Sequence, residues 1–131
     1  MNEMKHGCVV WIVDDEQWPR ACLRAELIER GCDAVGFTKL NRALSTLRSR
    51  RVVWPAVIVL ELRGQELTRA TLDALAGTRI PVVLLGGAQE MNDPLVRESK
   101  FAAALKRPVT LGAIADSVLG LVSAAGAPPR E

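Results

Sequence analysis

The sequence predicts an α/β fold in which a doubly wound, five-stranded parallel sheet is covered by helices on both faces. Two observations favour this fold class. Five short apolar runs alternate with segments whose apolar residues recur at helical spacing. The chain has 131 residues, 49% of them hydrophobic and 24% charged, so one domain can bury a core without metals or disulfides. The predicted strands span residues 8–13, 34–37, 56–60, 81–85 and 102–105.

The first two helices are predicted from apolar spacing and from residues suited to helix ends. Pro19 suits the first turn of the first helix, and Gly31 suits its end. Thr38 is the expected N-cap of the second helix, which ends in arginines within 48–51 that we interpret as a solvated terminus. The expected apolar faces are Trp18, Cys22, Ala25 and Ile28 in the first helix, and Leu40, Ala43, Leu44 and Leu47 in the second.

The remaining helices are marked mainly by their caps. A third helix is expected over 67–76 and ends at Gly77. A short fourth helix is expected after Asp93 as N-cap and Pro94 at the first helical position. The fifth helix follows Thr110 as N-cap, with its apolar stripe formed by Leu111, Ile114, Ala115, Val118, Leu121, Val122 and Ala125.

Charge and hydropathy exclude several classes of protein. The formal net charge of +2 is too small to indicate a nucleic-acid-binding surface. No apolar run reaches the ~18 residues of a membrane span, and the start of the chain lacks a secretory h-region. We therefore expect a cytoplasmic protein with neither nucleic acid nor membrane as partner. Residues 1–125 are expected to form the domain, and the proline-containing residues 126–131 a flexible tail or linker stub.

The rare residue types favour structural roles over catalytic ones. Cys8, Cys22 and Cys32 show no C-x-x-C pairing, which favours reduced, mostly buried thiols over a disulfide or zinc site. His6 is the one histidine, so histidine-based catalysis has little support. Trp54 is expected to be buried.

Charged residues follow several of the predicted strands. Because the carboxyl ends of parallel strands meet at one edge of a sheet, ligands and chemistry gather there. Asp14, Asp15 and Glu61 are therefore expected to form one acidic pocket beside a basic residue. The residues at these ends are Asp14-Asp15-Glu16, Glu61, Gly86-Gly87 and Lys106-Arg107-Pro108.

These ends resemble the receiver domains of two-component signalling over about residues 8–125. The resemblance is carried by Val13-Asp14-Asp15-Glu16, by a carboxylate that closes the third strand and by a basic residue before Pro108. It implies a flavodoxin-like (CheY-like) fold with strand order 2-1-3-4-5 and five flanking helices. In that family the first acidic pair helps to hold Mg²⁺, so the resemblance makes Asp14 and Asp15 candidate metal ligands.

The rest of the family pattern is altered. Glu61 stands where an aspartate accepts the phosphoryl group, and its extra methylene displaces the carboxylate by roughly 1 Å, which in-line transfer does not tolerate. Gly86 lacks the hydroxyl of the family's Thr or Ser, and Ala104 replaces the aromatic switch residue. Arg107 replaces the lysine before Pro108 and is expected to pair with Glu61 through its bidentate guanidinium.

The sequence therefore indicates an atypical receiver, or pseudo-receiver, that is not an enzyme and requires no cofactor. Its expected partner is a signalling protein, either a histidine kinase or an output protein, bound through the fourth helix, fifth strand and fifth helix. Mg²⁺ binding, a homodimer and a Glu61 that mimics a phosphorylated aspartate remain open. The alternative functions are a receiver phosphorylated by a histidine kinase and a small flavodoxin-like ligand-binding domain.

Overall fold

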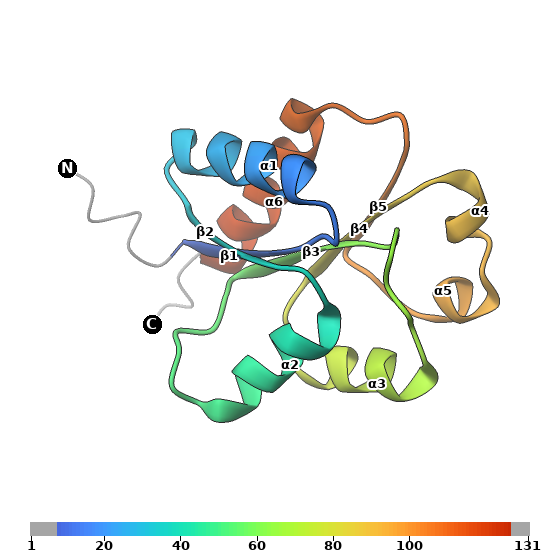
Figure 1. Ribbon diagram of the computed structural model, residues 1–131. Coiled ribbons are helices and arrows are strands. Elements are labelled where there is room, and N and C mark those ends of the chain that lie inside the picture. The colour runs from blue at the N-terminus through green and yellow to red at the C-terminus, as the bar shows by residue number, and fades with distance from the viewer. Residues whose placement is uncertain (1–7, 127–131) are drawn as a thin grey trace.

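Apolar, β-branched segments form the sheet at the centre of the computed structural model, which describes residues 8–126 (Figure 1). All strand pairs are parallel, and the order is β2-β1-β3-β4-β5, so the predicted fold class and strand order are confirmed. Every residue of β3 and β4 is buried, as expected for strands covered on both faces. The strands are β1 Val9–Val13, β2 Asp33–Phe37, β3 Val57–Glu61, β4 Val82–Gly86 and β5 Ala103–Lys106.

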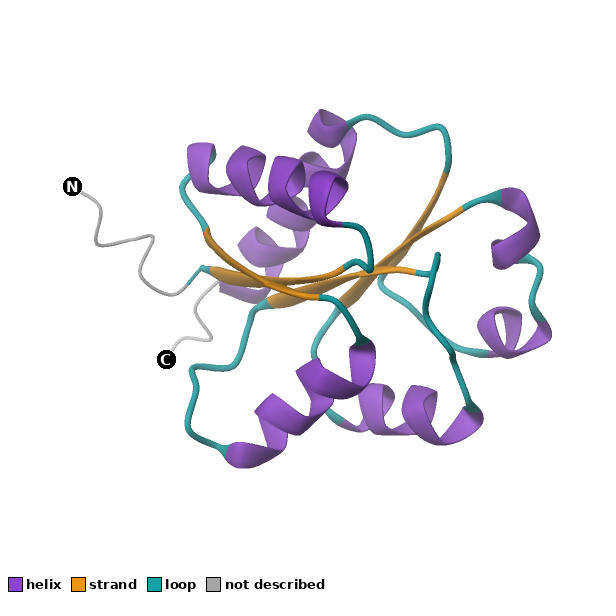
Figure 2. Ribbon diagram, viewed as in Figure 1, coloured by secondary structure: helices purple, strands orange, loops and turns teal. Residues whose placement is uncertain are grey.

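Helices cover both faces of this sheet (Figure 2). One core lies between the sheet and helices α1 and α6, and the other between the sheet and helices α2, α3 and α5. None of the described helices has both the length and the apolar character needed to cross a membrane. The helices are α1 Gln17–Glu29, α2 Leu40–Ser49, α3 Arg69–Gly77, α4 Ala88–Met91, α5 Pro94–Glu98 and α6 Leu111–Gly126.

The segment after β4 contains two short helices where the sequence predicted one. The predicted caps of α5 and α6 are confirmed, since Asp93 accepts from the Leu95 amide at 2.8 Å and Thr110 from the Ala113 amide at 3.0 Å. The additional helix, α4, is too short to show a hydrophobic period. Gly126 lies in α6, one residue beyond the predicted domain boundary, and the rest of the predicted tail, like His6, lies outside the described residues.

The predicted apolar face of α1 is wrong. Trp18 is 76% exposed and Ile28 44% exposed, whereas Leu23 and Leu27 are buried against the sheet. Both sets have helical spacing, so periodicity alone cannot choose between them. Contacts with the rest of the fold decide between the two sets, and they place Leu23 and Leu27 in the core formed with the sheet and α6.

The predicted N-cap of α2 is also wrong, by one residue. The helix has Lys39 as N-cap without a side-chain hydrogen bond. Gln65, from the β3–α3 loop, accepts from the Leu40 amide at 3.0 Å and donates to the Thr38 carbonyl at 2.8 Å. A residue distant in the sequence thus satisfies the helix end that Thr38 was expected to cap.

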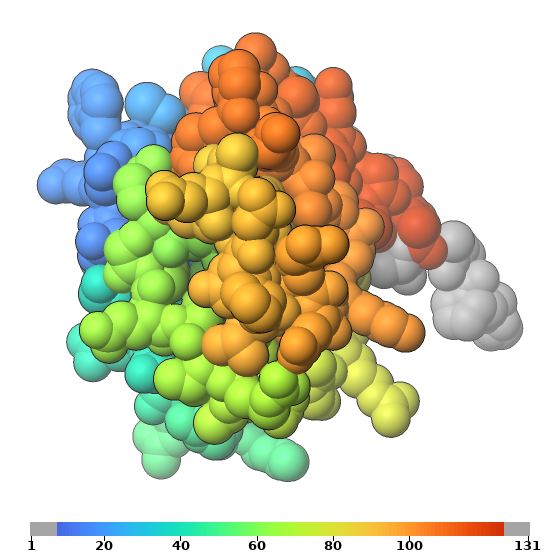
Figure 3. All heavy atoms as spheres, turned by 90° about the vertical axis from the view of Figure 1, so that its right-hand side faces the viewer, coloured from blue at the N-terminus to red at the C-terminus, as the bar shows by residue number. Residues whose placement is uncertain are grey.

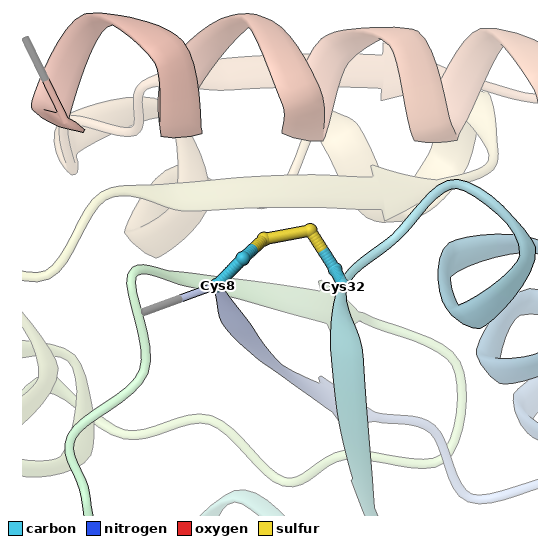
Figure 4. Close-up of a disulfide and its surroundings, with 2 residues drawn as sticks. All are labelled: Cys8 and Cys32. Atoms are coloured by element: carbon cyan, nitrogen blue, oxygen red, sulfur yellow. A yellow bond between two sulfur atoms is a disulfide. The ribbon is translucent and has the colours of Figure 1, made fainter. Parts of the chain in front are cut away.

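Cys8 and Cys32 form a disulfide, so the prediction of reduced thiols is wrong for this pair (Figure 4). Each cysteine directly precedes one of two paired strands, and the register Val9↔Asp33 brings their Cα atoms to 4.9 Å. The bridge is buried in the core beneath α6. Cys22 is free and half-buried.

The predicted burial of Trp54 is wrong as well. Its side chain is 46% exposed, and the preceding Val53 is 71% exposed. Both residues lie in the loop before Val57, where β3 begins, so they lack the neighbouring strands that would cover them.

Thiol titration tests the bridge. In the unfolded protein without reductant, Cys22 is expected to react and the bridged pair is not. Replacing Cys8 and Cys32 together by alanine is expected to lower the free energy of unfolding by about 3 kcal/mol, because the bridge closes a loop of 24 residues. Guanidinium denaturation measures this loss, with Cys22→Ala as the control. Three reactive thiols before reduction would contradict the bridge.

Candidate functional site

Two carboxylates are buried at the carboxyl edge of the sheet. Glu61, the last residue of β3, is 1% exposed, and Asp14, directly after β1, is 4% exposed. These strands are neighbours, so these two members of the predicted acidic pocket lie at one edge. A buried charge is unfavourable unless a partner compensates it, so the contacts of these carboxylates decide what the site can do.

Both oxygens of Glu61 accept hydrogen bonds. The Arg107 guanidinium donates to Oε1, and the Arg63 backbone amide donates to Oε2 at 2.9 Å. The predicted ion pair between Arg107 and Glu61 is therefore confirmed, but it is made by one guanidinium nitrogen and is not bidentate. Arg107 follows β5, its amide donates to the Gly86 carbonyl at 2.9 Å, and its peptide bond to Pro108 is cis.

Asp14 is compensated from the β3–α3 loop. Its Oδ1 accepts from the Glu16 amide at 2.9 Å and from the Arg63 guanidinium at 3.3 Å. The same guanidinium lies 3.2 Å from a carboxylate oxygen of Glu16. Arg20 donates to the Asp14 carbonyl at 2.7 Å. Sequence reasoning missed the role of Arg63, because it depends on the path of a loop that no local pattern specifies.

Asp15 makes no contact with this buried pair among the ion pairs and hydrogen bonds of the described residues. It is exposed and pairs with Lys39, whose ammonium lies 3.1 Å from Oδ1 and also donates to the Gly64 carbonyl at 2.8 Å. Gly64 has φ 78°, and a Cβ there would lie 2.6 Å from Asp15 Oδ2. Glycine is thus required for this close approach. The predicted three-carboxylate pocket therefore divides into the buried Asp14 and Glu61 and an outer Asp15.

No family model and no curated protein sequence matches the chain. Solved structures do. The chain aligns with the receiver domain of a Francisella response regulator at TM-score 0.75 and 19% identity, over 90% of this chain and 98% of that one. Receiver domains from Clostridium thermocellum (TM-score 0.73, 15% identity, 90% and 96%) and Burkholderia phymatum (0.69, 21%, 88% and 95%) are similar. This chain has the receiver-domain fold.

The residues at the receiver-type metal position do not fit a resident Mg²⁺. Asp14 already holds the Arg63 guanidinium, and Asp15 holds the Lys39 ammonium. Among residues 8–126, no three His, Cys, Asp or Glu side chains are placed to bind a metal together. Carboxylates that already face protein cations offer little net negative charge to a hard cation.

Gly86 and Ala104 stand where receivers carry a hydroxyl residue and an aromatic residue, and they lie in different surroundings. Gly86 is buried, and a Cβ there would lie 3.0 Å from Leu62 Cδ1 and 3.4 Å from Glu90 Oε1. A hydroxyl-bearing side chain therefore cannot enter unless Leu62 shifts. Ala104 is exposed on the edge strand β5 and lines a groove of about 510 Å³.

A cavity of about 130 Å³ lies beside Asp14, Glu61 and Arg107. Its other walls are apolar residues of the sheet, of α1, of α6 and of the segment leading into α6. Small-molecule sites usually occupy about 300–1,000 Å³, so this cavity is too small for a flavin-sized ligand.

A double-mutant cycle tests the buried ion pair. Arg107→Met is expected to lower the free energy of unfolding by roughly 2 kcal/mol, because Glu61 then stays buried without its charged partner. In a Glu61→Gln background the same change should cost about 1 kcal/mol less. Urea denaturation gives all four stabilities, and Lys106→Met, which alters the neighbouring exposed cation, is the control. Strict additivity of the two substitutions would contradict the pairing.

Proposed function

We propose that this chain is a signalling module of the receiver fold that acts by binding a partner protein and is not phosphorylated at Glu61. The observation that supports this most directly is the engagement of both Glu61 oxygens, one by Arg107 and one by the Arg63 amide. The proposal assigns the chain a binding role rather than a catalytic one. Its cytoplasmic localisation remains a prediction from the sequence.

Phosphoryl transfer depends almost entirely on positioning and on compensation of charge. An acceptor carboxylate needs an oxygen free for in-line attack and a cation that can draw the incoming phosphoryl oxygens. Here Glu61 is 1% exposed, and its two oxygens accept hydrogen bonds from the Arg107 guanidinium and from the Arg63 backbone amide. The pocket is therefore organised to stabilise an unmodified carboxylate.

We further propose that Arg63 takes the electrostatic place of a metal ion. Its guanidinium lies within 3.3 Å of Asp14 and 3.2 Å of Glu16 and thus links the acidic turn after β1 to the loop after β3. Unlike a metal ion, this cation is covalently part of the chain, so the pocket keeps one charge state whatever the Mg²⁺ concentration. A constant conformation at this edge follows.

The groove beside Ala104 supports binding of a protein partner. In the resembling family an aromatic side chain belongs at this position, and alanine leaves the space beside it open. Figure 3 faces α4 and α5, which border this groove. Its lining combines an apolar floor with the cations Arg97 and Lys100, and the apolar members are Leu84, Met91, Val96 and Phe101. A histidine kinase or an output protein fits this proposal, and a second copy of the chain is the alternative occupant.

Treatment with a small phosphodonor and Mg²⁺ tests the absence of phosphorylation. Intact-mass measurement is expected to show no phosphoryl adduct, because Glu61 is buried, each of its oxygens accepts a hydrogen bond, and Gly86 supplies no hydroxyl. A receiver with an aspartate acceptor, treated in parallel, is the positive control. An adduct on the wild-type chain that disappears in Glu61→Gln would refute the proposal and favour a phosphorylated receiver.

A magnesium titration tests the role of Arg63. Millimolar Mg²⁺ is expected to leave the Tm of the wild-type chain unchanged and to raise that of Arg63→Ala by about 3 °C, because the variant exposes Asp14 to the ion. Arg69→Ala, which removes an exposed arginine paired with Glu98, is the matched control and should not respond. Equal stabilisation of the wild type and Arg63→Ala would exclude an internal replacement of the metal.

A further inference from the structure

A second groove lies beside the loop from α2 to β3, at the lower left of Figure 1. This loop leads into the start of β3, so the groove lies at the edge of the sheet opposite to the carboxyl edge that holds Glu61. Its volume is about 430 Å³. Leu44 and Leu47 of α2 form buried parts of its wall, and α3 contributes small residues. The lining residues are Leu44, Leu47, Arg48, Arg50, Trp54, Ala74, Gly77 and Thr78.

The loop beside this groove exposes three consecutive apolar side chains. Val52 is 39% exposed, Val53 71% and Trp54 46%. A tryptophan that lines a groove and remains half-exposed is typical of an anchor at a protein interface. Neighbouring apolar side chains left in water favour a partner that covers them.

The charged residues that line the groove are all cations. They are Arg48 and Arg50, and Arg51 follows them in the chain. Within the described part of the chain, the side chains of these three arginines form no ion pair, and no acidic residue lines the groove. At the carboxyl edge, in contrast, Arg63 and Arg107 are both paired with carboxylates.

Arg50 directly follows α2, and its φ of 59° lies in the left-handed region, where glycine or asparagine is favoured after a helix. The helix dipole favours a cation at this end of α2, which accounts for the charge of Arg50. Its side chain forms no ion pair within residues 8–126 and can therefore pair with an anionic ligand.

We propose that this groove binds an acidic peptide segment of a partner protein. An apolar side chain of the peptide inserts against Leu47 and Trp54, and flanking carboxylates pair with Arg48 and Arg50. The apolar floor favours a peptide over nucleic acid. The net charge of the whole chain, only +2, is a second argument against nucleic acid. This inference does not depend on the phosphorylation state of the other edge.

Fluorescence anisotropy tests the proposal with a labelled peptide that carries a central leucine between runs of glutamate and aspartate. Binding to the wild-type chain is expected to weaken as salt is raised, because screening reduces the attraction of exposed charges. Arg48→Glu is expected to weaken binding by roughly tenfold. Arg42→Glu makes the same change at an exposed position earlier in α2 and is expected to leave binding within about twofold.

A steric variant gives an independent readout. A Cβ added at Gly77 meets nothing within 4 Å, so Gly77→Leu can project into open space without disturbing the core. It is expected to block the peptide, whereas Gly77→Ala retains binding. Thermal melts of each variant verify that the fold is intact.

Several outcomes would overturn the proposal. The proposal fails if the acidic peptide does not bind, or if a peptide with lysine in place of the acidic residues binds equally well. It also fails if neither Arg48→Glu nor Gly77→Leu alters the affinity for the acidic peptide. Tighter binding of a single-stranded oligonucleotide or of phosphatidylserine vesicles would assign the groove to nucleic acid or membrane. Self-association that Arg48→Glu abolishes would assign it to a second copy of the chain.

Discussion

The buried carboxylate of Glu61 imposes a requirement on every segment around it. A charge at the end of the central strand is tolerated only if its oxygens are hydrogen-bonded and its charge compensated. Arg107 reaches it from the end of β5, across the intervening β4, and the Arg63 amide reaches it from the following loop. The pair thus ties the edge strand, the central strand and a loop to one geometry. The conformation of the carboxyl edge depends on it.

The same principle extends over the whole edge. Arg63 compensates Asp14 and Glu16, and Lys39 joins Asp15 to the loop at Gly64. Each carboxylate therefore faces a cation from another segment, and the ion pairs hold the loops to one another. Because the carboxylates of this edge are already paired with cations of the same chain, they attract free metal ions only weakly. The arginines beside the opposite groove lack such partners, so the two edges of one sheet offer different chemistry.

Local sequence patterns were sufficient where the controlling interaction is local. The strands and the caps at Asp93 and Thr110 follow from apolar runs and from side chains that bond amides two or three residues away. The apolar face of α1 was not predictable, because two sets of residues share helical spacing. The cap of α2 was not predictable either, since Gln65 belongs to a loop that is distant in the sequence.

By itself, the sequence determined the fold class, the strand order implied by the receiver resemblance and the pairing of Glu61 with Arg107, which that resemblance places at the carboxyl ends of the third and fifth strands. Only the tertiary structure decided that Arg63 compensates Asp14, that Cys8 and Cys32 form a bridge and that Trp54 is exposed. The reason is physical. Hydrophobic periodicity reports on a few consecutive residues, whereas the partner of a charge or a thiol depends on strand register and loop path across the whole chain.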